Sequence, residues 1–378
     1  MNVIPKKNRT NPLLVEAGMT IAIALVFILI IPWLLSDFRL NLLGRFLALS
    51  IAALGIDLIW GYTGLLSMGH GVFFALGGYL LAMYLKLQIP PGATSQLPEF
   101  MNLYGVTELP SFWEPFRSFN FTLLAILIIP TTVGGLLGYL VFRNRIRGVY
   151  FSILTQAATV VFFNFFNGQQ KLFNGTNGLT DFKTILGADI GQLQFTFYLL
   201  TIITLVIAYT LCRWLTSGRF GNLLVAIRDD ENRLRFSGYN PTGFKVIVFA
   251  ISAALAGIGG AFYTIQTGRV SPQLMDIGFS IEMVIWVAAG GRGTLIGAVL
   301  GTLLVNFAKS LLSEQFPEIW LFFQGALFLL VVTVFPDGIV GLRKLFHKPQ
   351  QLITTYPDIN LNPEVQSDRE YPNNHKSD

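Results

Sequence analysis

The sequence predicts an all-α, polytopic membrane protein with about ten transmembrane helices. Hydrophobic residues make up 53% of the 378 residues and charged residues only 12%, too few polar side chains to cover a soluble globule of this size. The apolar residues fall in runs of roughly 20, the length that crosses a hydrocarbon core as a helix. Many basic residues lie in short connections beside these runs, as membrane topology favours.

The first apolar run, residues 17–35, follows three basic residues and so resembles a signal peptide. The Ser-Asp-Phe sequence at 36–38 is a poor cleavage site, so we interpret the run as a retained span. Nine further spans follow, and the division of 280–312 into two of them is left open. The ten expected spans cover residues 17–35, 40–60, 64–85, 121–142, 149–166, 195–215, 244–266, 280–290, 294–312 and 319–340.

The basic residues predict the orientation. Arg143, Arg145 and Arg147 form the densest basic cluster in any short connection, which should therefore be cytoplasmic. Counting spans outward from this loop places both termini and residues 218–238 on the same side. The basic residues near each terminus then also fall inside, an agreement that requires an even number of spans.

The expected organisation has three parts. Residues 1–16 form a cytoplasmic leader, 17–345 form the transmembrane domain, and 346–378 form a cytoplasmic tail. The tail has few apolar anchors, so we expect it to be disordered. Within the transmembrane domain, 86–120 form an external loop and 216–243 a cytoplasmic loop.

The external loop carries five prolines and six aromatic residues, three of which lie close together at 112–116. Phe112, Trp113 and Phe116 suit an aromatic belt at the membrane interface. A plain spacer is the alternative interpretation.

Residues 218–238 are a charged stretch between two long apolar runs. As a helix, this stretch places Leu223, Ile227 and Leu234 within about 40° of one another, as a narrow apolar stripe. The stretch begins with glycines, and it ends at Ser-Gly followed by Asn-Pro, which stop a helix. The stretch is therefore expected to be a short amphipathic helix at a membrane face.

The charges of this helix suit its solvated side. Asp229 with Arg233 and Glu231 with Arg235 are i,i+4 pairs in the favourable order, worth about 0.2–0.5 kcal/mol each. Two interpretations stay open: a helix that lies among the lipid headgroups, and a docking element for a cytoplasmic partner.

Two apolar regions, residues 60–79 and 286–301, are interrupted by glycine at membrane depth. Each begins with Trp and has Gly four and eleven positions later. Non-helical backbone in a bilayer must be packed in protein or line a wet cavity, and paired breaks point to a transport site. Close helix packing is the alternative role of these glycines.

Two further expectations concern the polar residues in these breaks. His70 could bond a solute or satisfy carbonyls that the first break frees. Glu282 and Arg292 are charges at membrane depth and could pair with each other. The candidate residues of the pathway are Ser67, Gly69, His70, Gln156, Asn177, Thr180, Glu282, Trp286, Gly291 and Arg292.

Several functions are excluded by what the sequence lacks. A single cysteine, Cys212, permits no disulfide within the chain, and the three scattered histidines offer no metal-ligand cluster. No G-x-x-x-x-G-K-[ST] sequence occurs, so energy would come from another chain or an ion gradient. No set of catalytic side chains stands out, so we expect no enzyme, no cofactor, no metal and no nucleic-acid partner.

Five segments together carry a family resemblance. They are GLLSMGHGVFFALGGYL (64–80), GVYFSILTQA (148–157), NGLTDF (177–182), AIRDDENRLRFSGYNP (226–241) and AGGRGTLIGAVLGTLLVN (289–306). From about residue 40 to 345 the chain resembles the permease subunits of branched-chain amino acid type ABC importers. Within that family it looks most like the urea branch, on the basis of residues 86–120 and 316–331.

The resemblance implies a bacterial inner-membrane importer. The partners would be a second homologous permease, two cytoplasmic ATPases and an external solute-binding protein. Residues 218–238 would then be a cytoplasmic coupling helix, in which Arg228, Asp229 and Glu231 set the contact with an ATPase. The residues assigned to the coupling helix are Gly218, Gly221, Leu223, Ile227, Arg228, Asp229, Glu231 and Arg233.

The expected cargo is urea, which is small, planar and neutral. Carbonyls in the breaks and the side chains of Gln156, Asn164, Asn177 and Thr180 suit urea without excluding a zwitterion. Three alternatives remain: a permease for branched-chain amino acids, a passive urea channel or carrier, and a membrane scaffold that transports nothing.

Overall fold

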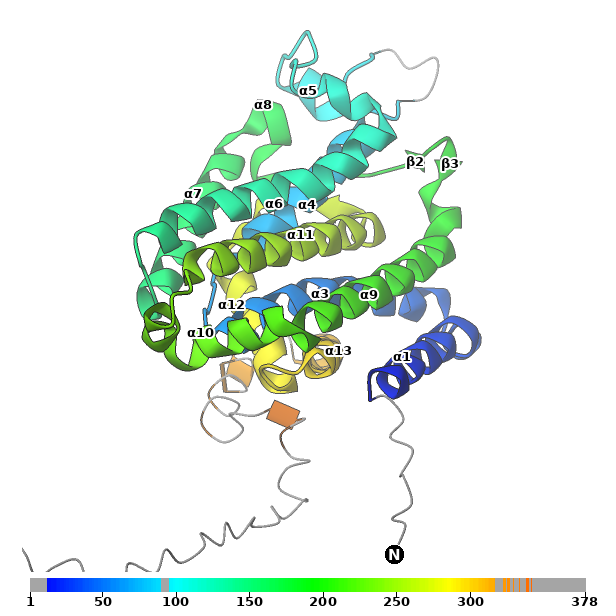
Figure 1. The fold of residues 1–378 in the computed structure, drawn as a ribbon. Helices are drawn as coiled ribbons and strands as arrows, with labels where there is room; N and C mark the ends of the chain where they lie inside the picture. The colour runs from blue at the N-terminus through cyan, green and yellow to red at the C-terminus, as the bar shows by residue number, and fades with distance from the viewer. Residues whose placement is uncertain are drawn as a thin grey trace, which may run out of the picture.

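The computed structural model describes residues 12–89 and 95–316, with scattered residues between 322 and 341. Most described residues are helical, as expected (Figure 1). The leader up to residue 11 and the tail 346–378 lie outside the described residues. The α-helices are α1 (Pro12–Leu29), α2 (Ile31–Leu34), α3 (Asp37–Thr63), α4 (His70–Lys86), α5 (Glu99–Leu103), α6 (Phe119–Arg143), α7 (Val149–Gly168), α8 (Gln170–Phe173), α9 (Gln194–Ser217), α10 (Arg219–Phe236), α11 (Pro241–Thr267), α12 (Ile277–Gly290) and α13 (Leu295–Gln315).

Four short strands form two small antiparallel ladders. β1 (Leu179–Thr180) pairs with β4 (Arg269–Val270), with Leu179 opposite Val270. β2 (Thr184–Ile185) and β3 (Ala188–Asp189) form a hairpin. The remaining elements are the 3-10 helices η1 (Glu114–Arg117), η2 (Gly175–Asn177), η3 (Ile190–Leu193) and η4 (Pro272–Met275).

Six helical segments in the described part of the chain are long and apolar enough to cross a membrane. The expected count of about ten is therefore not confirmed. The expected span 64–85 is a 17-residue helix that begins only at His70, because residues 64–69 are not helical. α12 has 14 residues. The expected span 319–340 lies largely outside the described residues.

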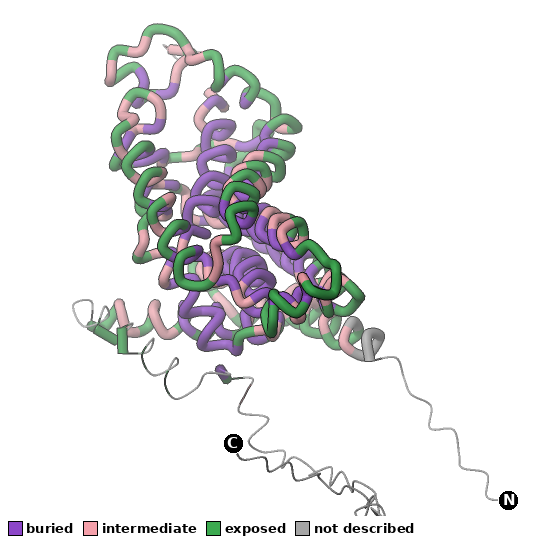
Figure 2. Tube along the Cα trace, turned by 60° about the vertical axis from the view of Figure 1, so that its left-hand side comes forward, coloured by how far each residue is buried: buried purple, intermediate pink, exposed green. Residues whose placement is uncertain are grey.

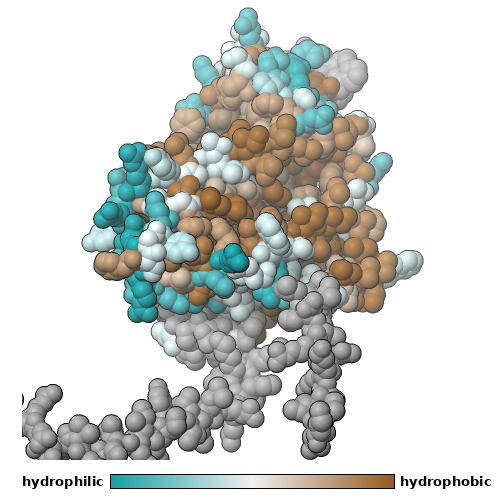
Figure 3. Space-filling view, in the orientation of Figure 1, coloured by the Kyte–Doolittle hydropathy of each residue, from teal (hydrophilic) through white to brown (hydrophobic). Residues whose placement is uncertain are grey.

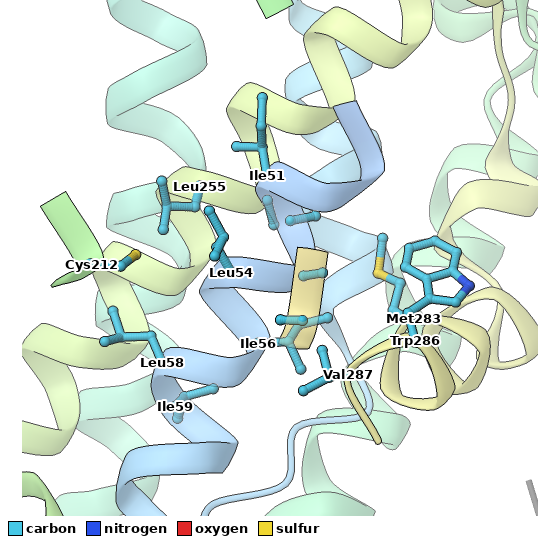
Figure 4. Packing of buried hydrophobic residues seen from close by; sticks show 14 of the residues in the cluster. Ile51, Leu54, Ile56, Leu58, Ile59, Cys212, Leu255, Met283, Trp286 and Val287 are labelled. Carbon is cyan, nitrogen blue, oxygen red and sulfur yellow. The ribbon is translucent and has the colours of Figure 1, made fainter. Parts of the chain in front are cut away.

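α3 occupies the centre of the bundle. It packs against α9, α10, α11, α12 and α13, and nearly all of its residues from Leu47 to Ile59 are fully buried (Figure 2). In Figure 4, Leu54 and Leu58 lie on the side of Leu255 and Cys212, whereas Ile56 lies on the side of Met283 and Val287 of α12. A displacement of α3 would therefore reach most of the spanning helices.

Glycines bring the backbones of α4 and α11 into direct contact. A Cβ atom at Gly77 would collide with the carbonyl oxygen of Gly257, and one at Gly260 would collide with that of Phe74. Contact between small residues is the usual way in which helices pack without a hydrophobic driving force. In α4, the glycines that follow the non-helical segment 64–69 therefore serve helix packing.

Apolar side chains also cover the outside of the bundle. Leu, Ile and Phe side chains on α6, α9 and α13 are exposed, and they form the broad hydrophobic surface in Figure 3. Hydrophilic residues gather at the two ends, over α10 and over the segment that contains α5. This pattern is typical of a bundle whose sides face lipid.

The loop between α4 and α6 differs from its expected form. Trp113 and Phe116 are buried, and only Phe112 of the three aromatic residues is exposed. The Trp113 ring packs against Phe100 and Phe173. An aromatic belt formed by all three residues is therefore wrong, because two of the side chains fill a core of their own.

The α4–α11 contact makes a prediction about stability. Gly77→Ala should lower the free energy of unfolding by about 1–3 kcal/mol, since the added methyl group meets backbone that cannot yield. Gly135→Ala in α6 is the matched control, because its methyl group would lie 3.6 Å from Ala250 Cβ, an ordinary contact. Thermal unfolding in detergent would measure both variants, and equal midpoints would contradict the prediction.

Candidate functional site at α10 and the broken helices

α10 is bent, although a single straight helix was expected. Asp230 has non-helical backbone angles (φ −158°, ψ 94°), and its Oδ1 accepts hydrogen bonds from the amides of Asn232 and Arg233, both at 3.0 Å. Asp230 thus caps a second short helix, since an aspartate side chain competes well for the first free amides. The Asp229–Arg233 pair does not form as expected, and Arg233 lies 3.6 Å from Asp230 instead.

The buried face of α10 differs from the predicted stripe at one residue. Leu224, Ile227 and Leu234 are buried, whereas Leu223 is half-buried. Gly221 is also buried, and a Cβ atom there would collide with the Thr216 carbonyl at the end of α9. Gly218 has open space around it and serves as the N-cap.

Glu231 anchors the second half of α10 to the bundle. Its carboxylate meets Lys245 Nζ of α11 at 2.5 Å, Arg235 Nη2 at 2.8 Å and Arg147 Nε, in the loop before α7, at 3.2 Å. Burial alone would raise the pKa of Glu231, but the hydrogen bonds from Lys245 and Arg235 outweigh burial and hold the pKa below its ordinary value. The carboxylate therefore faces the bundle and does not form an exposed docking contact.

The exposed face of α10 carries both charge and one large aromatic side chain. The side chain of Asp229 is 63% exposed and that of Arg233 85%, and Phe236 is 92% exposed. The sequence reasoning missed Phe236. The sequence feature that could have indicated Phe236 is an aromatic residue on the amphipathic helix outside the apolar stripe.

Hydroxyl groups of α7 satisfy the backbone of the first broken segment. The Ser152 hydroxyl donates to the Leu66 carbonyl at 2.7 Å, and the Met68 amide donates to Thr155 Oγ1 at 3.0 Å. Thr159 donates to the Met68 carbonyl at 3.3 Å. The sequence reasoning missed these three residues, whose i, i+3, i+7 spacing places them on one face of α7.

The polar residues of the first break lie in the packed interior. The ring of His70 is fully buried, with Nε2 2.6 Å from Ser252 Oγ, and Ser252 in turn donates to the Gly55 carbonyl at 2.6 Å. His70 therefore links α4 to α11 and α3, and it does not contact the carbonyls of 64–69. Ser67 is buried, and Gly69 is needed because a Cβ atom there would lie 2.8 Å from the Thr155 carbonyl.

The second break is a glycine turn between α12 and α13. Gly291 and Gly293 have positive φ angles of 125° and 76°, which glycine tolerates best. The guanidinium group of Arg292 lies over the Trp60 ring, 5.3 Å from its centre. The structure thus brings the two broken segments together at the end of α3.

The expected Glu282–Arg292 pair is wrong. Lys309 Nζ lies 2.6 and 2.8 Å from the two carboxylate oxygens of Glu282. The chain turns back after Gly290, so α13 runs beside α12 and brings Lys309 to Glu282, while Arg292 stays at the turn. Trp286 is fully buried, with its ring against Phe279.

The other pathway candidates lie apart from this junction. Gln156 is half-buried on α7, and Asn177 closes η2. Thr180 lies in β1, opposite Arg269, and its hydroxyl donates to Asp181 at 3.0 Å. Among the described residues, no group of three His, Cys, Asp or Glu side chains could hold a metal ion.

The charges around Glu231 predict a pH dependence. A carboxylate whose pKa is lowered on folding stabilises the folded state above its ordinary pKa of 4.5, and this contribution is lost as the pH falls through the lowered value. Glu231→Gln should therefore cost about 3 kcal/mol at pH 7, because the buried Lys245 loses its charged partner. The difference from the wild-type chain should shrink as the pH falls below 4.5 and should disappear only below the lowered pKa of Glu231.

Thermal unfolding across this pH range measures the effect. Glu114→Gln is the control, since Glu114 forms an exposed pair with Arg117. A deficit of Glu231→Gln that persists unchanged in acid would show that the charge is not its cause.

Comparison with known proteins identifies the family. The family model for the branched-chain amino acid transport system / permease component matches residues 38–332. The high-affinity branched-chain amino acid transport system permease protein LivM of Salmonella typhimurium is 23% identical over 338 residues, which cover 83% of this chain and 72% of LivM. LivH of Escherichia coli, from the same type of system, is 24% identical over 308 residues, or 77% and 91% of the two chains.

A more distant relative is the ribose import permease protein RbsC of Haemophilus influenzae, 21% identical over 229 residues, which cover 58% of this chain and 69% of RbsC. No solved structure matches the chain. The family model covers more than half of the chain, including every helix from α3 to α13. The chain therefore belongs to the permease component family of branched-chain amino acid transport systems.

Proposed function

We propose that this chain is the permease subunit of an ATP-driven ABC importer and that α10 is its coupling helix. The observation that carries the proposal is the two-sided character of α10. Its outer face exposes Asp229, Arg233 and Phe236, while its inner face is fixed to the bundle through Leu224 and Glu231. Such an element can receive force from a soluble partner and pass it to spanning helices.

The proposed orientation places α10 in the cytoplasm. Arg147 contacts Glu231, so α10 and the basic loop 143–148 share one end of the bundle. Short basic loops favour the cytoplasmic side of a bacterial inner membrane. α1, α4 and α12 together with residues 319–340 would complete ten spans and bring both termini inside.

The partners follow from the same proposal. Two cytoplasmic ATPases would supply the energy, since the sequence has no phosphate-binding loop of its own. A second homologous permease would complete the pathway, and an external binding protein would deliver the solute. Cycling between outward and inward openings requires that nucleotide states favour different conformations of the bundle.

For the cargo, we propose branched-chain amino acids. LivM and LivH are named for this class of solute, so we replace the expected urea by the alternative cargo, branched-chain amino acids. Ser67, His70 and Trp286 are buried within one chain, which supports a packing role over a pathway-lining role. The solute path is then expected along a surface that the second permease completes.

The exposed face of α10 should hold the ATPase. Arg233→Glu combined with Phe236→Asp should reduce the ATPase that co-purifies with the permease at least tenfold, because both side chains point away from the bundle. Arg143→Glu is the matched control, as an exposed arginine at the same end but outside α10. Co-purification that equals the wild-type level would contradict docking through α10.

The transport reaction tests the cargo and the energy source together. In proteoliposomes with all subunits, uptake of labelled leucine should require ATP inside the cytoplasmic compartment and should exceed urea uptake at least tenfold. The permease alone should move neither solute. Urea uptake by the permease alone would favour the passive channel, and no uptake with intact assembly would favour the scaffold.

A further inference from the structure

The C-terminal end of α3 meets α10 and the glycine turn 291–293 at a single junction. Arg228 Nη1 donates to the Gly61 carbonyl at 2.9 Å. Gly61 lies in the last turn of α3, where a carbonyl has no partner within the helix. Arg228 therefore caps α3 from a position 167 residues away in the chain, where a cation also suits the helix dipole.

The stem of Arg228 reinforces this contact. A Cβ atom at Gly64, the C-cap of α3, would lie 3.0 Å from Arg228 Cγ. Arg228 Nε meets the exposed Asp229 at 3.1 Å, so the guanidinium group is fixed on both sides. Movement of the first half of α10 must then displace the end of α3.

Asp57 connects α3 to the turn. Its side chain is fully buried one turn before Gly61, and its Oδ1 accepts a hydrogen bond from the Gly293 amide at 2.7 Å. Its Oδ2 has no partner among the described residues. A buried carboxylate with one free oxygen is a costly way to hold a turn, which argues for a role other than stability.

The backbones at the junction are in direct contact. A Cβ atom at Gly61 would lie 2.6 Å from the Gly293 nitrogen, so the turn packs directly against the backbone of α3. Arg292 over Trp60 holds the turn from the other side. Beyond the turn, a Cβ atom at Gly290 would collide with the Gly297 carbonyl, so α12 and α13 form a tight hairpin.

We propose that Asp57 and Arg228 are positioning residues that relay movement of α10 to the α12–α13 hairpin. Arg228 fixes α10 to the end of α3, and Asp57 fixes α3 to the turn. The inference rests on the proposed function, because a relay has a purpose only if α10 is driven by a partner. It assigns Arg228 an inward role rather than a direct contact with the ATPase.

The test uses the complete transporter in proteoliposomes and measures ATP hydrolysis and leucine uptake together. Asp57→Leu removes the acceptor for the Gly293 amide at similar volume, and it should lower the leucine molecules moved per ATP at least tenfold while hydrolysis stays within twofold. Asp57→Asn keeps an acceptor oxygen and should retain the wild-type ratio. A wild-type ratio in Asp57→Leu would overturn the proposal.

A distance measurement separates a relay from a merely structural role. Spin labels at Asn222→Cys in α10 and Leu300→Cys in α13 lie on exposed positions, and the buried Cys212 stays unlabelled. In the wild-type complex and in Asp57→Asn, the distance should be the same with and without ATP. In Asp57→Leu it should change with ATP. A wild-type distance that changes, or one that stays constant in Asp57→Leu, would overturn the relay.

Two further results keep the test decisive. If Asp57→Leu does not assemble, Arg228→Leu takes its place, because it removes the Gly61 contact from a side chain that is 35% exposed. The same two changes are expected, and their absence would refute the relay. If the proposed function is wrong, the wild-type complex will show no ATP-dependent leucine uptake. The spin-label distances would still show whether Asp57 couples α10 to α13.

Discussion

Every backbone amide and carbonyl inside an apolar bundle needs a partner within the protein, because lipid offers none. Where α3 ends inside the bundle, this requirement is met by side chains of other helices. Ser152 and Thr155 of α7 form hydrogen bonds with the backbone of residues 64–69, and Arg228 donates to the Gly61 carbonyl. Specific hydrogen bonds thus stabilise the non-helical backbone of the breaks. They also link helices that would otherwise touch only through apolar contacts.

The sequence predicted the parts of the fold that depend on composition and run length. The helical bundle, its apolar surface and the amphipathic α10 followed from the hydrophobic runs and from the charges at 218–238. Pairing in space was not accessible in the same way. Glu282 has Lys309 as its partner because α13 folds back on α12, which the spacing of Glu282 and Arg292 along the chain does not reveal.

The errors in the candidate site have local causes. Helical periodicity placed Asp229, Glu231 and Arg233 on one continuous rod, but the Asp230 side chain captures two amides and bends it. Glu231 was expected on the solvated side, but Lys245 of α11 and Arg147 of the loop before α7 draw it inward. Phe236 is the prominent exposed group, because nine residues separate it from Ile227 and place it opposite the buried stripe of the helix.

The bend also separates α10 into two halves with different attachments. The half before Asp230 contacts α3 through Arg228 and, by way of Asp57, the turn before α13. The half after it contacts α11 and the loop between α6 and α7 through Glu231. A rigid rod would move both attachments together, whereas a bent element allows each half to move with its own set of helices. Under the proposed function, a partner bound to the exposed side of α10 would act on two groups of spanning helices at once. Opening a passage between these groups would require such a difference in movement.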